Sequence, residues 1–128
     1  MILPFVVPQQ SLTGTNAYQN SDCNQDSEID SAIADFTKLI ALSPEDAWAI
    51  FFRGMVYEAK GEFDSAIADY DKLIALKPKN ANTYIVRGLA YADWGEDDGA
   101  IADFRRALEI DPSNQSAKNS LKALGVTA

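Results

Sequence analysis

The side chains that most often carry catalysis or hold metals are scarce in this chain of 128 residues. It has no histidine, and its single cysteine is Cys23. Without histidine it cannot assemble a Ser-His-Asp or Cys-His nucleophilic site, a histidine-ligated zinc or the commonest general base near neutral pH. One thiol excludes an internal disulfide and a multi-thiolate metal site. Only carboxylate chemistry is left to consider.

Acidic residues gather in two places. Between residues 22 and 33 they alternate faintly like a calcium-binding loop, but Ser27 and Ile33 stand where that loop needs a glycine and a bidentate acid. The second group crowds one predicted turn and comprises Asp93, Glu96, Asp97 and Asp98. Four carboxylates could attract a cation or a basic partner, although acids at the start of a helix are also favoured by its dipole. Catalysis by paired carboxylates needs two acids facing one pocket, so we predict a non-enzyme without catalytic residues, cofactor or metal.

The charge balance also excludes some partners. Eleven Lys and Arg against nineteen Asp and Glu give a net charge of −8. A sequence-independent grip on nucleic acid or on an anionic membrane surface is therefore not expected. Residues 47–80 carry no net charge, and most of the acid lies on the segments 28–46 and 81–114 that flank them. The charge is expected to favour solubility, with at most a weak preference for a basic partner.

The first twelve residues form an apolar leader that ends in Pro8 and a short polar run. Its core, Ile2–Val7, is interrupted by Pro4, and no Lys or Arg precedes it. It is too short to cross a bilayer, so no membrane insertion is predicted. Three interpretations stay open: the tail of a longer export signal, a disordered leader, or a segment that docks back on the domain. The compartment stays open: the sequence favours the cytoplasm, and a periplasmic or exported protein would follow if residues 1–12 are the remnant of a signal peptide.

The sequence repeats itself every 34 residues. The tetrapeptide Ala-Ile-Ala-Asp occurs at 32–35, 66–69 and 100–103, and prolines at 44, 78 and 112 keep the same step. Further repeated positions are Gly54 with Gly88, Tyr57 with Tyr91, Ala66 with Ala100, Tyr70 with Phe104 and Pro78 with Pro112. A period of this length is typical of solenoid proteins built from stacked supersecondary units.

Each unit is predicted to be a pair of antiparallel helices. Over residues 47–60 and again over 63–76, small or apolar residues recur at intervals of three and four, which marks one helical face. Gly61 is expected to end the first helix, and Asp46, Asn80 and Asn114 to cap the helices that follow them. Glycines inside helices, as at Gly54, cost stability relative to alanine, so we expect them to allow close approach of two helices.

This pattern resembles the tetratricopeptide repeat (TPR) of the short bacterial type. The residues that carry the resemblance are Ala81, Tyr84–Tyr91, Ala100, Phe104 and Pro112. It implies an all-α, right-handed α-solenoid of about 2.5–3 repeats. Its parts are an N-terminal segment 1–27, a half-repeat 28–46, complete repeats 47–80 and 81–114, and a capping helix 115–125. Asn20 and Cys23 stand at the glycine and tyrosine places of the first unit, so whether residues 13–26 form a true first helix stays open.

The resemblance further implies that the first helix of each repeat lines a concave groove. The residues expected there are Trp48, Phe51, Phe52, Met55, Asn82, Ile85, Val86 and Leu89. None of them is Lys or Arg, so the cationic clamp with which some relatives hold chaperone tails is absent, and a co-chaperone role is not predicted. Some of these side chains could instead be core between neighbouring helices.

We therefore predict an interaction module that binds a protein or peptide, such as an amphipathic helix, in an apolar groove. The alternative is an assembly subunit that self-associates through the groove or the N-terminal segment.

The sequence also predicts ion pairs between repeats. Arg53 and Arg87 are each expected to pair with the aspartate of the preceding unit, which gives Asp35–Arg53 and Asp69–Arg87 and leaves Asp103 free.

Overall fold

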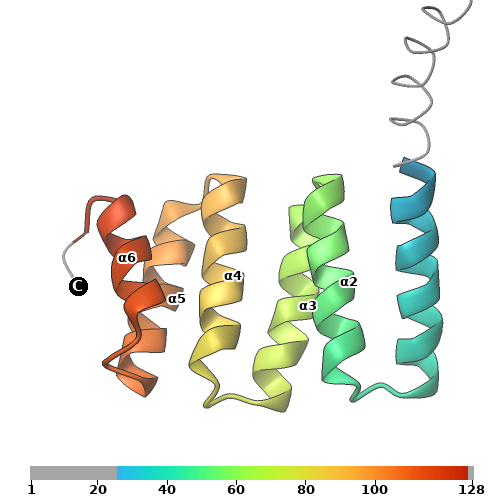
Figure 1. Ribbon diagram of the computed structural model, residues 1–128, viewed down its shortest axis with the longest axis horizontal. Coiled ribbons are helices and arrows are strands. Elements are labelled where there is room, and N and C mark those ends of the chain that lie inside the picture. Colours follow the sequence, from blue (N-terminus) through green and yellow to red (C-terminus); the bar gives the residue numbers. More distant parts are fainter. Residues whose placement is uncertain (1–25, 127–128) are drawn as a thin grey trace, which may run out of the picture.

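The structure is a computed structural model that describes residues 26–126. Within that range the chain forms six helices and no strand. A helix over residues 26–42 is followed by α2 (Ala47–Lys60), α3 (Phe63–Leu76), α4 (Ala81–Trp94), α5 (Asp97–Ile110) and α6 (Gln115–Ala123). In Figure 1 the helices follow one another along the long axis from helix 26–42 to α6, with α3 partly behind α2 and α5 partly behind α6. The predicted all-α helical repeat solenoid is confirmed.

Local capping chemistry fixes where the helices begin and end. The Asp46 carboxylate accepts from the Ala49 amide at 3.1 Å, and the Asn114 side chain accepts from the Ala117 amide at 3.0 Å. Asn80 caps α4 through the Asn82 amide at 3.0 Å. Gly61 and its equivalent Gly95 end α2 and α4 with φ of 87° and 89°, a left-handed backbone that favours glycine. The predicted caps are confirmed.

The two helices of a repeat approach closely at a glycine. A Cβ on Gly54 would lie 2.6 Å from Cε1 of Tyr70, and one on Gly88 would lie 2.7 Å from Cε1 of Phe104. Both rings are fully buried, so no other residue fits against them without a shift. This confirms why each repeat has a glycine inside its first helix.

Two apolar clusters stabilise the stack. The first joins α2, α3 and α4 through residues such as Ile50, Ala66 and Tyr70. The second joins α4, α5 and α6 through residues such as Phe104 and Leu121. Because α4 contributes to both clusters, each repeat is stabilised by its neighbours, as in other solenoids.

The arginine of each repeat pairs with the aspartate of its own repeat. Nε and Nη2 of Arg53 donate to the two Asp69 carboxylate oxygens at 2.9 and 2.6 Å, and Arg87 holds Asp103 in the same way at 2.8 and 2.7 Å. The predicted pairs Asp35–Arg53 and Asp69–Arg87 are wrong, and Asp103 is paired. The error is one of orientation, because the tetrapeptide aspartate faces back to the helix that precedes it in the same repeat.

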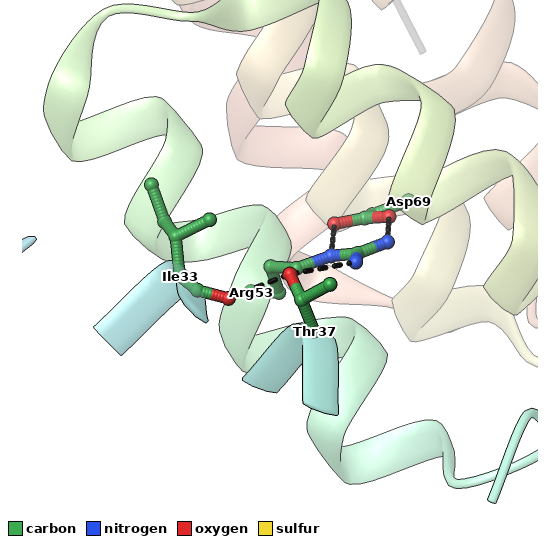
Figure 2. Close-up of polar contacts among 4 residues, drawn as sticks. All are labelled: Ile33, Thr37, Arg53 and Asp69. Carbon is green, nitrogen blue, oxygen red and sulfur yellow. Dashed lines mark hydrogen bonds and ion pairs between the residues drawn. The ribbon is translucent and has the colours of Figure 1, made fainter. Parts of the chain in front are cut away.

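The preceding repeat contributes a different contact. Nη1 of Arg53 donates to Thr37 Oγ1 at 3.2 Å, and the same hydroxyl donates to the Ile33 carbonyl at 2.6 Å. Figure 2 shows Arg53 between Thr37 on one side and Asp69 on the other. One repeat later, Arg87 reaches Asp71 at 2.6 Å. Each arginine therefore links its own repeat to the preceding one.

Of the helices in residues 26–126, none is both long and apolar enough to cross a membrane.

Candidate peptide-binding groove

Exposed apolar side chains form a stripe along α2 and α4. The exposed fractions are 70% for Trp48, 40% for Phe52, 46% for Met55 and 46% for Leu89. The other predicted groove residues divide into exposed Asn82, half-buried Phe51 and Val86, and buried Ile85. Solitary exposed apolar residues are ordinary on a protein surface, whereas several on neighbouring helices make this surface the candidate site.

Ile85 does not line the groove. It is 7% exposed and belongs to the cluster with Phe104 and Leu121. Val86 packs instead on the cluster of α2, α3 and α4, and Asn82 and Leu89 are exposed. Ile85 is therefore a core residue, and a charged residue at this place would test folding rather than binding.

A pocket of about 340 Å³ lies at the amino-terminal ends of α2 and α4. Its larger apolar lining residues are Trp48 and Phe51 of α2, Leu73 of α3 and Val86 of α4. Its remaining lining residues are Ala47, Lys77, Asn80, Asn82 and Thr83. The pocket thus combines an apolar wall with one cation and several hydrogen-bonding groups, as small binding sites commonly do.

Sequence reasoning missed Lys77, Asn80 and Thr83 because it considered only the helix faces that follow the repeat pattern. Lys77 and Asn80 belong to the turn between α3 and α4. The signal that could have found them is their position directly before Ala81, where a short turn must bring them beside the start of α4. The pocket therefore has a positive charge that the groove residues alone do not have.

The aromatic side chains at the groove are packed against one another. The ring centroids of Trp48 and Phe52 are 5.8 Å apart and nearly parallel, and those of Phe51 and Phe52 are 5.4 Å apart. Phe36 of helix 26–42 stacks on Phe52 at 6.1 Å. Contacts of this kind hold aromatic side chains in place before a ligand arrives, which lowers the entropy cost of binding.

The carboxyl-terminal part of α2 carries a half-buried acid. The Tyr70 hydroxyl donates to Oε1 of Glu58 at 2.5 Å. Burial raises the pKa of Glu58 above its ordinary value, the bond from Tyr70 opposes that change, and the negative charge of Asp93 adds to it. Burial and the Glu58 carboxylate together raise the pKa of Tyr70. The negative charges of Glu58 and Asp93 would favour a basic group of a ligand at this end of α2, whereas the positive charge of Lys77 would disfavour one at the pocket.

The acidic turn is a solvated surface. Asp93, Glu96, Asp97 and Asp98 are all exposed, and Asp97 and Asp98 lie in the first turn of α5. Among residues 26–126, no three His, Cys, Asp or Glu side chains are grouped as metal ligands.

The interpretations of Ile2–Val7, of residues 13–25 and of Cys23 concern positions outside the described residues.

Antiparallel helix pairs with a period of 34 residues define a helical-repeat scaffold of the kind that serves protein–protein interaction. A family model described as TPR repeat matches residues 54–95, and one described as Tetratricopeptide repeat matches residues 81–114. The chain is a member of the tetratricopeptide repeat family.

Solved structures agree with this assignment. The first TPR of Spaghetti (RPAP3), bound to an HSP90 peptide, is 25% identical with a TM-score of 0.68, over 84% of this chain and 86% of that one. The Arabidopsis OM64 TPR domain is 29% identical with a TM-score of 0.66, over 87% of each chain. The MamA protein is 36% identical with a TM-score of 0.62, over 79% of this chain and 51% of that one. No curated protein matches this chain in sequence.

Proposed function

We propose that this chain is a non-catalytic interaction module that binds an apolar peptide segment or an amphipathic helix along α2 and α4. The observation that carries the proposal is the stripe of Trp48, Phe52, Met55 and Leu89, each at least 40% exposed. An apolar ligand side chain would fill the pocket of about 340 Å³ beside Trp48 and Phe51. Exposed aromatics that become buried on binding commonly carry most of the affinity of such interfaces.

The charges beside the groove support a direction for the ligand. Lys77 lies at the pocket near the start of α2 and α4, whereas Glu58 and Asp93 lie toward their ends. A ligand segment with an acidic or carbonyl group beside Lys77 and a basic residue beside Glu58 would match the charges at both ends of the groove. The structure of RPAP3 with an HSP90 peptide supports ligand binding by a related domain. The exposed stripe itself has no Lys or Arg, so we expect a different ligand chemistry from that acidic peptide.

The experiment selects peptides from a displayed random library against the full chain and measures their affinities for variants. Trp48→Ala and Leu89→Glu are expected to weaken binding at least about tenfold, because each removes or charges an exposed contact without touching the core. Trp94→Ala is the matched control, since Trp94 is an exposed tryptophan (44%) that stacks on Phe63 away from the stripe. Peptides that bind wild type and Trp48→Ala equally would contradict the proposal.

The alternative is that the stripe contacts a second copy of the chain. The same exposed apolar side chains favour it, because such a surface is a liability in a monomer. Light scattering over a dilution series distinguishes the two proposals. A monomer at every concentration contradicts the assembly alternative, and a dimer that Leu89→Glu dissociates supports it.

A further inference from the structure

Within residues 26–126, helix 26–42 is the first helix of the solenoid. A pocket of about 640 Å³ lies between this helix and α2. Its apolar lining comes from Ile29, Ala32 and Phe36 on helix 26–42 and from Phe52, Met55 and Val56 on α2. This site is distinct from the pocket between α2 and α4, although Phe52 and Met55 border both surfaces.

Helix 26–42 repeats the apolar face that α3 and α5 bury. Ala66 and Ala100 are 0% exposed, whereas Ala32 at the same place in the repeat is half-buried. Leu39 is 47% exposed, whereas Leu73 is 8% exposed. In α3 and α5 the covering element is the preceding helix, α2 or α4. Helix 26–42 therefore presents the surface of a repeat whose first helix is not among the described residues.

Asp35 adds a charge to this surface. It stands at the place of Asp69 and Asp103, which are 2% and 4% exposed and are each held by an arginine through two hydrogen bonds. Asp35 is exposed, and no residue in the described range 26–126 pairs with it. We name Ala32, Asp35, Phe36 and Leu39 the acceptor face.

The two complete repeats show which helix fits an acceptor face. The covering helix carries an arginine that pairs with the aspartate, followed by a glycine that lies against the aromatic ring, as Arg53-Gly54 does with Asp69 and Tyr70. The chain itself has Gln19 and Asn20 at the corresponding places of the first unit. Glutamine has no positive charge, and asparagine is larger than the space beside such a ring allows.

We propose that the acceptor face binds an amphipathic helix of another protein, in which an arginine is followed by glycine or another small residue. The arginine pairs with Asp35, and the small residue lies against Phe36. Apolar side chains of the same helix enter the pocket of about 640 Å³. This helix completes the first repeat in trans. A second copy of the chain is a poor source, because Gly54 and Gly88 already lie against Tyr70 and Phe104 in their own repeats.

The test uses a synthetic peptide with the sequence of α4, Ala81–Trp94, as a probe, because it contains the Arg-Gly pair in a helical context. Binding to the full chain is measured by calorimetry in a double-mutant cycle. Asp35→Asn in the protein and Arg87→Gln in the peptide are each expected to weaken binding about tenfold, and the double change no further than either alone. Glu45→Gln, which removes an exposed acid outside the acceptor face, is expected to have no effect.

Three outcomes would overturn the proposal. Absence of binding to the full chain would mean that its own N-terminal residues occupy the face, or that the face is no site. Binding with equal affinity to wild type and Asp35→Asn would place the peptide elsewhere. Self-association that disappears in Asp35→Asn would identify a second copy as the occupant and would also contradict the proposal. Leu89→Glu, at a groove residue on α4 that does not line the pocket of about 640 Å³, should leave the probe's affinity unchanged, which separates this site from the groove along α2 and α4.

Discussion

Arg53 and Asp69 lie sixteen residues apart and form a two-point ion pair between α2 and α3, with Nη2 2.6 Å from Oδ1. The side chain of Asp69 is 2% exposed and that of Arg53 is 11% exposed, so water reaches neither freely. The bond to Asp69 is the largest cause of the raised pKa of Arg53. Asp69→Asn should lower the free energy of unfolding by about 2–4 kcal/mol, because it leaves a largely buried guanidinium without its counter-charge. Urea unfolding followed by circular dichroism measures this change.

Asp35→Asn is the matched control for that substitution. Asp35 occupies the same place in the repeat but is exposed. A change of no more than about 0.5 kcal/mol is expected, as for most surface substitutions. Equal losses in the two variants would mean that the repeat position, rather than the buried ion pair, determines the stability.

Gly54→Ala should destabilise the chain even though alanine is the better helix former. A Cβ would meet the Tyr70 ring at 2.6 Å, and that ring is fully buried. The overpacking is expected to cost about 1–3 kcal/mol in the same unfolding experiment. Gly61→Ala tests a different cause, since nothing lies within 4 Å of its Cβ and φ is 87°. Its cost should be about 1 kcal/mol, from the left-handed backbone alone. A more stable Gly54→Ala variant would contradict the close-approach explanation.

Stability should fall at alkaline pH through Tyr70. Its pKa is raised above the ordinary value of 10.0 by burial and by Glu58. Above pH 10.0 the unfolded state releases the Tyr70 proton, whereas the folded state keeps it. The contribution of Tyr70 to the free energy of unfolding is therefore fully present below pH 10.0 and is lost as the pH rises above that value. Tyr70→Phe removes this contribution. Between roughly pH 9 and 11, wild type should lose about 1 kcal/mol more than the variant, measured by urea unfolding at each pH.

The control for that prediction comes from the next repeat, where Phe104 and Ala92 replace Tyr70 and Glu58. The double variant Tyr70→Phe, Glu58→Ala reproduces this pair and should fold without an unpaired half-buried acid. If wild type and both variants lose stability equally with pH, Tyr70 is not the group responsible.

Tryptophan fluorescence should report occupancy of the groove. Trp48 is 70% exposed and Trp94 is 44% exposed. Acrylamide should quench the fluorescence of the Trp94→Phe variant, which keeps Trp48, more strongly than that of the Trp48→Phe variant, which keeps Trp94. A selected peptide should protect Trp48 from acrylamide and leave Trp94 unaffected. Protection of Trp94 alone would contradict the proposed groove.

The sequence by itself determined the repeat, the helices and their ends. A period of 34 residues, a glycine at each left-handed cap and Asp46, Asn80 and Asn114 at the helix starts are signals that act within a few residues. The glycine inside each first helix also predicted the close approach that Tyr70 and Phe104 make. These features need no knowledge of how one helix is turned against the next.

Only the tertiary structure decided which side chains face one another. It paired Arg53 with Asp69 rather than Asp35, placed Ile85 in the core, and brought Lys77 to the pocket beside Trp48. Helical periodicity defines a face only to about the width of one side chain, because successive residues are about 100° apart. The rotation and crossing of packed helices depend on how all their side chains fit together, and that rotation decides the partner of each arginine and the lining of the groove.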